Sequence, residues 1–385
     1  MKILHIIPYF APAWGFGGPV KVSFELAKRT AQKGHKVAVA ATDAYDYNQR
    51  IEKLHEFIEP VEVFRFRNLN PNLAKGLNLY LPLGFKKFII RNLKNYDLAH
   101  LHSFFTYQNI EARKFCRKYK IPYVLHLHES PIPVKEKGKL IWKKIFNAVW
   151  GKKILRDAKK ILVLTSKEKD DLTGFMPDLV RKIEILPNGI KLAPRKKTIG
   201  FQKNHKTILA LSRLSYIKGI DRLIEAFALL SREDPAYWLV IAGGDEAEER
   251  KKLEKLVDRL GIKKKVRFVG HVTGQKKEKI YRSADIYALF SRYDAFGMTV
   301  LEALEQDLPV CLSKEVGVAK DVMGFKCGNL VEQSENPAAG AKALRQTYQN
   351  RAALSKNCRR ALKQFDINHI VDKLISTYKK ALKPS

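Results

Sequence analysis

Short runs of apolar residues alternate along the chain with longer segments in which apolar residues recur every three or four positions. The first run, Ile3–Ile7, predicts a buried strand, and a glycine-rich loop at Ala13–Gly18 and a helix from about Pro19 to Lys33 follow it. Further strands are predicted in the first half of the chain at Lys36–Ala41, Leu98–His102, Tyr123–His128 and Lys160–Thr165. Strands that alternate with helices in this way are typical of a parallel sheet that helices cover on both faces.

The same alternation starts again in the second half of the chain, after a segment with few apolar residues. This segment, Leu192–Lys206, contains Pro194, Gly200 and five basic residues, and we expect it to be a linker. The pattern then predicts strands at Thr207–Ser212, Trp238–Ala242, Val266–Val269, Ile286–Phe290 and Pro309–Leu312, and helices at Gly219–Leu230 and Ala247–Leu260. We therefore expect an α/β fold with two Rossmann-like, open parallel-sheet domains in tandem, which face each other across a cleft.

The composition fits two domains of ordinary size. The chain has 385 residues, of which 45% are apolar and 10% aromatic, and this excludes disordered, collagen-like and small disulfide-rich proteins. It contains 72 Lys and Arg against 39 Asp and Glu, a formal net charge of +33. Such an excess predicts attraction to an anionic partner, which could be a nucleic acid, a phosphorylated substrate or an anionic membrane face.

The cysteines and the start of the chain bear on localisation. The four cysteines are Cys116, Cys311, Cys327 and Cys358. They form no C-x-x-C pair and no zinc-type spacing with histidines, so we expect free thiols in a reducing compartment. The opening apolar run is interrupted by His5 and ended by Pro8, too early for a signal peptide, and no segment approaches the roughly 18 apolar residues of a membrane span. We expect a cytoplasmic protein that is soluble or peripheral on the inner face of the cell membrane.

Gly17 and Gly18 lie between the first predicted strand and the helix that follows it. Glycines at this point let the backbone approach a phosphate group closely, and the positive end of the helix dipole adds to the attraction. The segment W-G-F-G-G-P does not match the G-x-G-x-x-G pattern of dinucleotide-binding domains. A phosphate contact and an ordinary turn therefore both stay open.

Two cations flank the loop that follows the predicted strand Thr207–Ser212. They are Arg213 and Lys218, in the segment S-R-L-S-Y-I-K-G-I. Cations fixed at the carboxyl end of a strand can hold a diphosphate and offset the charge that grows on it as it leaves. The alternative is a pair of solvated surface charges.

Two carboxylates eight positions apart follow the strand Ile286–Phe290. Asp294 ends the loop after this strand, and the predicted helix that starts near Phe296 carries Glu302. Such a spacing arises often by chance, but the free amides at the start of a helix are suited to hydroxyl groups and phosphate oxygens. We therefore expect a polar binding site at this helix start.

His128 is predicted to end the strand Tyr123–His128. A histidine in this position can bind a substrate hydroxyl or transfer a proton, and it can also be purely structural. His100, His102 and His126 lie in the same half of the chain, and their alternate spacing could attract a metal ion. No carboxylate or cysteine completes a metal site in the sequence, and we expect none.

Together these motifs resemble those of the GT-B-type glycosyltransferases of family 4, a large retaining group that uses nucleotide-sugar donors. In chain order the matching segments are G-F-G-G-P, H-L-H-E, P-N-G-I at Pro187–Ile190, S-R-L-S-Y-I-K-G, I-A-G-G-D, V-R-F-V-G-H, A-D-I-Y-A-L-F-S and the acidic segment that runs into L-P-V. The resemblance implies an acceptor-binding domain at 1–193 and a donor-binding domain at 194–365. It also implies a final helix within 366–385 that crosses back to the first domain.

The resemblance assigns roles to individual residues. Arg213 and Lys218 would hold the donor diphosphate, and His128 would bind the donor sugar near its 6-position. Asp294 would bind hydroxyls of the sugar, and Glu302 those of the ribose. The donor-binding residues that the motifs further imply are Gly17, Gly18, Asn188, Phe296, Gly297, Met298 and Thr299, and Val269 and His271, which lie where the family binds the base.

These roles imply a glycosyltransferase that moves a hexose-type sugar from a UDP- or GDP-sugar to a hydroxyl of a glycan or lipid-linked glycan, in polysaccharide or glycoconjugate biosynthesis. The anomeric configuration would be retained, and no nucleophile is identified. Because two cations would balance the leaving diphosphate, no metal cofactor is implied. The family usually has Glu where this chain has Asp294, which is one methylene shorter, so the sugar hydroxyl that it reaches can differ.

A lysine-rich segment, Lys135–Lys160, contains apolar residues at helical spacing. The predicted apolar stripe consists of Ile141, Trp142, Ile145, Phe146, Val149 and Trp150. A helix of this kind can lie on an anionic membrane, and the acceptor would then be a polyprenyl-diphosphate-linked glycan; the alternative is an ordinary core-facing helix. Leu81–Lys94 has a similar character. The residues expected to contact membrane or acceptor are Trp142, Lys143, Lys144 and Trp150.

Two other function classes stay open from the sequence. Binding to nucleic acid would explain the charge of +33, but the chain contains no helix-turn-helix, zinc-finger or RNA-binding aromatic motif. A sugar-nucleotide epimerase could use the same two-domain fold. It would need acid and base residues around the sugar rather than the Arg213 and Lys218 pair and the acidic helix motif.

Overall fold

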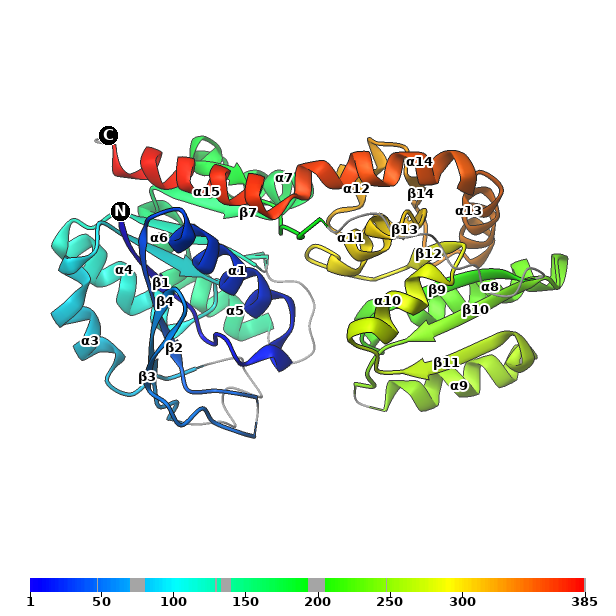
Figure 1. Ribbon diagram of the computed structural model, residues 1–385, viewed down its shortest axis with the longest axis horizontal. Coiled ribbons are helices and arrows are strands. Elements are labelled where there is room, and N and C mark those ends of the chain that lie inside the picture. Colours follow the sequence, from blue (N-terminus) through cyan, green and yellow to red (C-terminus); the bar gives the residue numbers. More distant parts are fainter. Residues whose placement is uncertain are drawn as a thin grey trace. The chain divides into compact units, whose positions relative to one another are not determined.

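The computed structural model (Figure 1) describes residues 1–46, 48–69, 80–128, 130–132, 140–192, 205–246 and 248–383. The chain divides into two compact units, each with its own sheet. Unit 1 consists of Met1–Gly189 and Ile367–Ser385, and unit 2 consists of Ile190–Asp366. Residues 193–204 of the predicted linker lie outside the described residues, and its last residue, Lys206, already belongs to a strand.

Unit 1 is built on an eight-stranded sheet in the order β3-β4-β2-β1-β5-β6-β7-β8. Its strands are β1 (Lys2–Ile6), β2 (Lys36–Thr42), β3 (His55–Ile58), β4 (Val61–Phe66), β5 (Leu98–His102), β6 (Tyr123–His126), β7 (Lys160–Val163) and β8 (Ile183–Ile185). All neighbouring strands are parallel except β3 and β4, an antiparallel edge that the sequence pattern did not predict. The central strands are buried along almost their whole length, which explains their continuous apolar runs.

Helices cover both faces of this sheet (Figure 1). Their bounds are α1 (Gly18–Gln32), α3 (Phe85–Asn92), α4 (Tyr107–Tyr119), α5 (Leu140–Phe146), the π-helix η3 (Asn147–Gly151), α6 (Lys152–Asp157), α7 (Ser166–Phe175) and α15 (Ile367–Leu382), with 3-10 helices at Trp14–Phe16, Leu93–Asn95 and Pro177–Lys182. Apolar residues of α3, α4, α6 and α7 share one core, and those of α1 and α15 share another. The last helix of the chain is therefore part of unit 1.

Two of these helices begin after a threonine that caps them. Thr106 precedes α4, and its hydroxyl oxygen accepts a hydrogen bond from the Asn109 N–H at 3.2 Å. Thr165 does the same for α7 through the Glu168 N–H at 3.1 Å. Threonine caps of this kind stabilise a helix by about 1 kcal/mol because they satisfy an N–H that has no partner within the helix.

Unit 2 contains a six-stranded sheet, entirely parallel, in the order β11-β10-β9-β12-β13-β14. Its strands are β9 (Lys206–Leu211), β10 (Tyr237–Ala242), β11 (Val266–Gly270), β12 (Ile286–Leu289), β13 (Val310–Ser313) and β14 (Gly328–Val331). The first five match the predicted strands to within one residue at each end. The sixth, β14, contains a glycine and has only one buried residue, Val331, so it lacks the apolar run that marks the others.

The helices of unit 2 are α8 (Ile220–Glu233), α9 (Glu249–Arg259), α10 (Gly274–Arg282), α11 (Met298–Glu305), α12 (Ala319–Met323), α13 (Pro337–Gln349) and α14 (Arg351–Leu362), with 3-10 helices η5 (Tyr216–Lys218), η6 (Lys263–Lys265) and η7 (Lys363–Phe365). Apolar residues of α8, α9 and α13 form one core with the central strands. Both domains are thus α/β units with a parallel sheet, as the pattern predicts. Helix α9 begins two residues later than predicted, and Ala247 lies outside the described residues.

Candidate functional site

The sheet of unit 2 has a switch point between β9 and β12. The chain proceeds from β9 to β10 and β11 on one side, and then continues from β12 to β13 and β14 on the other side. In open parallel sheets, ligands bind at such a point, outside the carboxyl ends of the strands. The loop after β9 carries Lys218, and the loop after β12 carries Asp294, so two predicted site residues come from the two strands of the switch point.

Lys218 and Asp294 are in direct contact at this switch point. The Lys218 Nζ donates to Oδ2 of Asp294 at 2.6 Å, and only 15% and 16% of their side-chain surfaces are exposed. Gly219 makes this approach possible, because its φ is +59° and a Cβ there would lie 2.0 Å from the carbonyl oxygen of Phe290. The loop after β9 can therefore press against the end of β12 and present Lys218 to Asp294.

Asp294 also organises the start of α11. Its Oδ1 accepts a hydrogen bond from the N–H of Phe296 at 3.3 Å. Gly297, with φ +94°, is packed so closely that a Cβ would lie 2.9 Å from Cγ1 of Val316. Within the described part of the chain, the N–H groups of Gly297, Met298 and Thr299 have no acceptor. Four free amides were predicted here; Phe296 uses its own, so three remain for a ligand.

Glu302 lies on α11 and is held by two residues that sequence reasoning did not identify. The Nζ of Lys277 donates to its Oε1, and the hydroxyl of Tyr281 donates to its Oε2 at 2.9 Å. Both partners lie on α10, four residues apart, and therefore on one face of that helix. The pKa of the Tyr281 hydroxyl is raised well above its ordinary value, mainly by burial and to a smaller extent by the charge of Glu302. Tyr281 therefore keeps its proton and acts here as a hydrogen-bond donor.

Arg213 lies on the same edge of the sheet but has a different partner. Its guanidinium donates to both carboxylate oxygens of Glu246, at 3.0 and 2.8 Å, and 68% of its side chain is exposed. Gly243 lets the two loops approach each other, because a Cβ on it would lie 1.6 Å from the carbonyl oxygen of Ser212. Arg213 and Lys218 thus both follow β9, but Arg213 pairs with a carboxylate from the loop after β10.

The residues predicted to meet a base lie at the end of β11. Val269 is half-buried within this strand, and His271 is exposed just beyond it. A Cβ on Gly244 would lie 3.7 Å from Nδ1 of His271, so the loops after β10 and β11 are neighbours. Arg213, Lys218, Asp294 and His271 therefore all follow carboxyl ends of strands in one parallel sheet.

In unit 1, Gly17 and Gly18 lie directly before and at the start of α1. Gly17 has a φ of +82°, which explains why it is glycine, and its N–H already donates to the carbonyl of Trp14 at 3.0 Å. Gly18 has an ordinary φ, and a Cβ on either glycine would meet no atom within 4 Å. The backbone of Gly18 therefore borders open space, and no contact within the described chain requires a glycine there.

Asn188 follows β8 and is buried, with 7% of its surface exposed. Its side-chain oxygen has no hydrogen-bond partner in the described part of the chain. The neighbouring Gly189 packs tightly against the start of α15, since a Cβ there would lie 2.5 Å from Cδ1 of Ile367. Gly189 of the P-N-G-I segment thus packs on the last helix within unit 1, and Asn188 stays a predicted ligand-binding residue.

His128 lies two residues beyond the end of β6, not within the strand as predicted. Its φ of +54° is in the left-handed region, which turns the chain away from the strand direction. The ring is buried, and its Nε2 lies 2.9 Å from Nδ1 of His102. Burial lowers the pKa of His128 to about 4, so its imidazole is neutral near pH 7.

Four more histidines surround His128, because the strand register brings them together. His5 of β1 lies opposite His100 of β5, and His102 of β5 lies opposite His126 of β6. All four are buried, and ring nitrogens of two sets of three lie within 4.8 Å of one another: His5, His100 and His102, and His102, His126 and His128. His5 is 95 residues from His100 in the sequence, so no local pattern pointed to it. That no metal is bound stays a prediction.

The lysine-rich segment forms a continuous run of α5, η3 and α6, but its apolar residues do not form one stripe as predicted. Trp142, Phe146 and Trp150 face inward and pack against the core of unit 1. The exposed apolar residues are instead Ile141, Ile145 and Val149, at 74%, 48% and 43%. At this spacing the two sets point in different directions around the helix. The two tryptophans are therefore half-buried residues that pack on the core, and the exposed apolar surface of this run is formed mainly by the second set.

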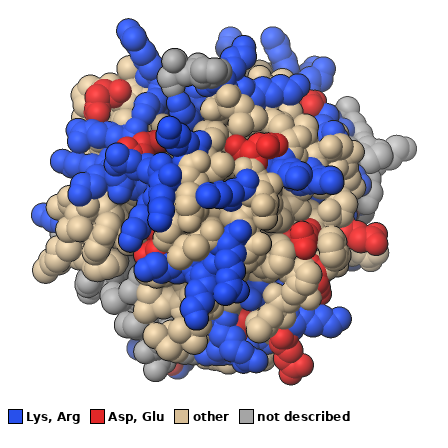
Figure 2. Space-filling model, turned by 90° about the vertical axis from the view of Figure 1, so that its left-hand side faces the viewer, with Lys and Arg blue, Asp and Glu red and all other residues tan. Residues whose placement is uncertain are grey.

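Exposed cations gather on the neighbouring helices. Helices α3 and α4 pack side by side, and their exposed basic residues are Lys86, Lys87, Arg91, Lys114, Arg117 and Lys118. Figure 2 views unit 1 from the side on which these helices lie, and shows Lys and Arg far in excess of Asp and Glu. Among the described residues, no helix is both long and apolar enough to cross a lipid bilayer.

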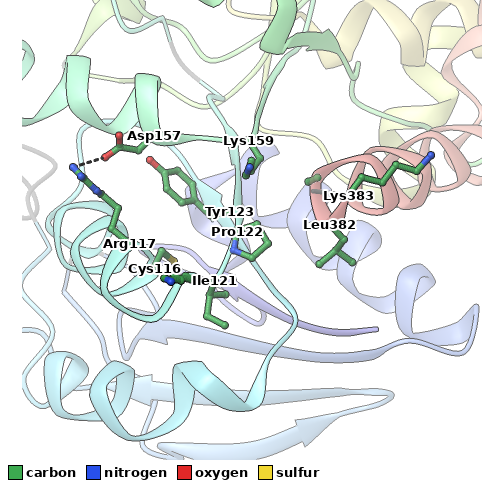
Figure 3. Close-up of a pocket in the computed structure, with 11 residues that line it drawn as sticks. Cys116, Arg117, Ile121, Pro122, Tyr123, Asp157, Lys159, Leu382 and Lys383 are labelled. Atoms are coloured by element: carbon green, nitrogen blue, oxygen red, sulfur yellow. Dashed lines mark hydrogen bonds and ion pairs between the residues drawn. The ribbon is translucent and has the colours of Figure 1, made fainter. Parts of the chain in front are cut away.

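A pocket of about 380 Å³ lies between α4, α6 and the end of α15, and Tyr123 is one of the residues that line it (Figure 3). It is at the amino ends of β6 and β7, the edge of the sheet opposite to His128. Its lining includes Arg117, which contacts Asp157 at 3.5 Å, and Lys383. The pocket thus continues the basic surface of α4 and is separate from the candidate site residues.

Comparison with known families agrees with this arrangement. Residues 194–365 match the family described as glycosyl transferases group 1, and residues 16–193 match glycosyltransferase family 4. An uncharacterized glycosyltransferase from Methanocaldococcus jannaschii is 27% identical over 379 residues, which cover 93% of each chain. Mannosylfructose-phosphate synthase from Agrobacterium fabrum is 27% identical over 343 residues, which cover 80% of this chain and 73% of that protein.

The fold is also that of known glycosyltransferase structures. Sucrose-phosphate synthase from Thermosynechococcus elongatus superposes with a TM-score of 0.76 at 18% identity and covers 99% of both chains. Anabaena HepE, solved in complex with UDP and glucose, gives a TM-score of 0.72 at 20% identity and covers 98% of this chain and 99% of its own. The two Rossmann-like units, the motifs in their order and these matches together show that the chain belongs to glycosyltransferase family 4, group 1, and is a glycosyltransferase of GT-B type.

Proposed function

We propose that this enzyme transfers a hexose-type sugar from a UDP- or GDP-sugar to a hydroxyl of a glycan or lipid-linked glycan, with retention of the anomeric configuration. The observation that carries the proposal is the Lys218–Asp294 pair at the switch point of unit 2, next to the free amides of α11. A cation, a carboxylate and three aligned N–H groups suit a ligand that has both a diphosphate and sugar hydroxyls.

In this proposal Lys218 and Arg213 bind the diphosphate, which replaces their present carboxylate partners. As the bond between C1 and the phosphate oxygen breaks, the electron pair leaves with the nucleoside diphosphate. The acceptor oxygen forms the new bond to C1 from the same face, and its proton passes to the departing phosphate oxygen. Lys218 stabilises the negative charge that grows on the diphosphate, a type of stabilisation that contributes about 100- to 1000-fold to turnover in other enzymes.

The exchange of partners gives Asp294 its role. When the diphosphate takes over Lys218, the Asp294 carboxylate is released toward a sugar hydroxyl, while its Oδ1 continues to accept from the N–H of Phe296. The amides of Gly297 to Thr299 face the same ligand. Glu302 accepts from the ribose hydroxyls and keeps Tyr281 as its second donor. The proposed donor contacts in unit 1 are Gly17, Gly18 and Asn188. The ring of His128 accepts a hydrogen bond from a hydroxyl of the sugar.

The base is proposed to lie against Val269 and His271, at the end of β11. The UDP complex of Anabaena HepE supports UDP as the first nucleotide to test. A thermal-shift series with UDP, GDP, ADP and a short single-stranded DNA tests the proposal. At about 100 times its dissociation constant, a ligand stabilises the folded protein by roughly 2.7 kcal/mol. A shift with one nucleoside diphosphate is expected, and a shift with DNA alone would contradict the proposal.

A second proposal concerns an anionic membrane surface as partner. Ile141, Ile145 and Val149 form an exposed apolar stripe, and the exposed Lys144, Lys152 and Lys153 lie on the same helical run. An apolar stripe flanked by lysines is what binding to an anionic lipid surface requires. It would bring the enzyme to a polyprenyl-diphosphate-linked acceptor, with Lys143 and Lys144 near its diphosphate.

Vesicle sedimentation tests the membrane proposal. Replacement of Ile141 and Ile145 by Ser is expected to reduce binding to phosphatidylglycerol vesicles at least tenfold, whereas phosphatidylcholine vesicles should bind neither protein. Val180→Ser changes an apolar residue of similar exposure elsewhere in unit 1 and serves as control. Unchanged binding of the double variant would contradict a role for this stripe.

A further inference from the structure

A chain of hydrogen bonds connects His128 to the interior of unit 1. Nε2 of His128 lies 2.9 Å from Nδ1 of His102, and Nε2 of His102 lies 2.9 Å from Nδ1 of His5. Nε2 of His5 lies 3.4 Å from the hydroxyl of Tyr378, which lies 2.6 Å from Nδ1 of His100. The five residues come from β1, β5, the loop after β6 and α15, and all are buried.

The protons in this chain depend on one another. Burial lowers the pKa of every histidine in it, so each ring is neutral near pH 7 and carries a single N–H. A ring that donates through one nitrogen must then accept through the other. The direction of the first hydrogen bond therefore determines all the others.

The distances at Tyr378 indicate this direction. A separation of 2.6 Å suits an O–H donor and is shorter than the range of about 2.7–3.2 Å for N–H donors, so Tyr378 donates to Nδ1 of His100. The hydroxyl has only one proton, which His100 takes, so in its longer contact of 3.4 Å with His5 it can only accept, from Nε2–H of His5. It follows that His5 accepts from Nε2–H of His102, and that His102 accepts from Nε2–H of His128. Nδ1 of His128 is then without a proton.

We propose that Tyr378, His5 and His102 are positioning residues that fix the tautomer of His128, so that its Nδ1 accepts a hydrogen bond from a donor-sugar hydroxyl. This inference deepens the proposed function and rests on it for the identity of the hydroxyl. These hydrogen bonds are unsuited to storing a proton, because a proton passed inward would leave a buried cation on His100, and no carboxylate contacts that ring among the described residues. Its role is to fix direction rather than to accept charge.

The separations argue against a metal ion in the same place. Zinc bound to nitrogen at about 2.0–2.1 Å in tetrahedral geometry separates its ligand atoms by about 3.3 Å. The two histidine pairs in the chain are 2.9 Å apart, which is a hydrogen-bond distance. Both ring nitrogens of His126 lack a hydrogen-bond partner in the described part of the chain. Its ring stacks on His128, with centroids 4.0 Å apart, and on His100 at 5.7 Å.

Nuclear magnetic resonance of protein with ¹⁵N-labelled histidine rings tests the inference without an activity assay. Resonances of His128 are assigned by their loss in His128→Gln. The wild type is expected to show a protonated Nε2 and an unprotonated Nδ1 at His128. In Tyr378→Phe, Nε2–H of His5 loses its acceptor. We therefore expect the hydrogen bonds between His5, His102 and His128 to reverse their direction, which places the proton of His128 on Nδ1. Tyr123→Phe, which removes another buried hydroxyl bonded to the Ile154 carbonyl, should leave His128 unchanged.

Three results would overturn the inference: a protonated Nδ1 in the wild type, a tautomer of His128 that Tyr378→Phe does not change, or stoichiometric zinc in the purified protein. Kinetics test the second half of the inference. Tyr378→Phe is expected to raise the donor KM about tenfold, the effect of one lost hydrogen bond, while binding of the nucleoside diphosphate alone stays the same. If the tautomer reverses and the donor KM does not change, the row of hydrogen bonds is confirmed, and the proposed contact of His128 with the sugar is contradicted.

Discussion

The two units hold their candidate residues in opposite electrostatic states. In unit 2 every cation of the site faces a carboxylate: Lys218 faces Asp294, Arg213 faces Glu246, and Lys277 faces Glu302. In unit 1 the corresponding residues are neutral imidazoles that are buried and bonded to one another. One site is built from charges and the other from hydrogen bonds between uncharged groups.

This difference indicates how the two sites can respond to a ligand. A cation that is paired with a carboxylate can exchange it for a phosphate oxygen, so Lys218 keeps an anionic partner when a diphosphate binds. The Asp294 carboxylate then loses its cation, and its remaining hydrogen bonds come from the N–H of Phe296 and from hydroxyls of the sugar. A neutral histidine chain has no charge to exchange, and it can only donate or accept hydrogen bonds. We therefore expect unit 2 to bind the charged part of the donor and unit 1 to contact hydroxyls.

The largest expected effect is a loss of stability of unit 1 at acidic pH. The pKa values of His5 and His128 are lowered by burial to about 3 and about 4, whereas an unfolded histidine titrates near 6.5. Between these values the unfolded chain binds protons that the native protein excludes, so stability is lost as the pH falls below about 6.5. Each such histidine contributes about 1.4 kcal/mol per pH unit.

Urea denaturation followed by tryptophan fluorescence at pH 7.5 and pH 5.5 measures this effect. Three of the four tryptophans, Trp14, Trp142 and Trp150, belong to unit 1, and Trp238 belongs to unit 2. Trp238→Phe restricts the signal to unit 1. A free energy of unfolding that is the same at both pH values would show that the histidines are not held neutral.

Lys218→Ala tests the charged site. Turnover, measured as release of nucleoside diphosphate from the donor, is expected to fall about 100- to 1000-fold, because no other cation contacts Asp294 among the described residues. Lys251→Ala removes a solvent-exposed ion pair of the same unit, with Glu248, and should leave turnover unchanged. Near-normal turnover in Lys218→Ala would remove this residue from the mechanism.

Gly219→Ala asks whether the approach of the two loops is needed to position Lys218. A Cβ here would lie 2.0 Å from a backbone oxygen at a φ of +59°, and we expect a loss of stability of about 1–3 kcal/mol together with weaker donor binding. Gly34 also has a positive φ, +87°, but a Cβ added there would meet no atom within 4 Å. Gly34→Ala therefore measures the cost of the backbone conformation without the close contact. Equal effects of the two variants would mean that the close approach is unimportant.

Arg213→Ala should have the smallest effect of the four. The guanidinium is largely exposed, so water screens its charge, and we expect the donor KM to rise about tenfold with little change in kcat. Steady-state kinetics at two salt concentrations measure this, since the contribution of an exposed cation should shrink at high salt. A fall in kcat as large as that of Lys218→Ala would place Arg213 at the reacting phosphate.

The sequence pattern predicts the parts of this molecule that repeat a simple rule. Strand β5 has the predicted bounds. Lys218 and Asp294 could be selected because each lies in a loop after a strand, and Glu302 because it lies on the helix that follows the second of these loops. The order of the matching motifs along the chain indicates the family. These features depend on residues that are near one another in the sequence.

The rest depends on contacts between distant segments. His5 and Tyr378 are 373 residues apart and meet only because β1 and α15 belong to the same unit. Lys277 and Tyr281 look like ordinary surface residues of a helix until α10 packs near Glu302. In the run 141–150, apolar residues on two neighbouring faces look like one stripe, because the pattern alone does not show which face the core covers.

The most direct test of the central claim compares a nucleoside with its diphosphate. Isothermal titration gives the dissociation constants of uridine and UDP, or of guanosine and GDP if GDP is selected, for the wild type and for Lys218→Ala. If the switch point of unit 2 holds the diphosphate, it should improve binding about 100-fold in the wild type and at most about tenfold in the variant, while the nucleoside binds both equally. The same improvement in both proteins would contradict the account, because the diphosphate would then bind elsewhere.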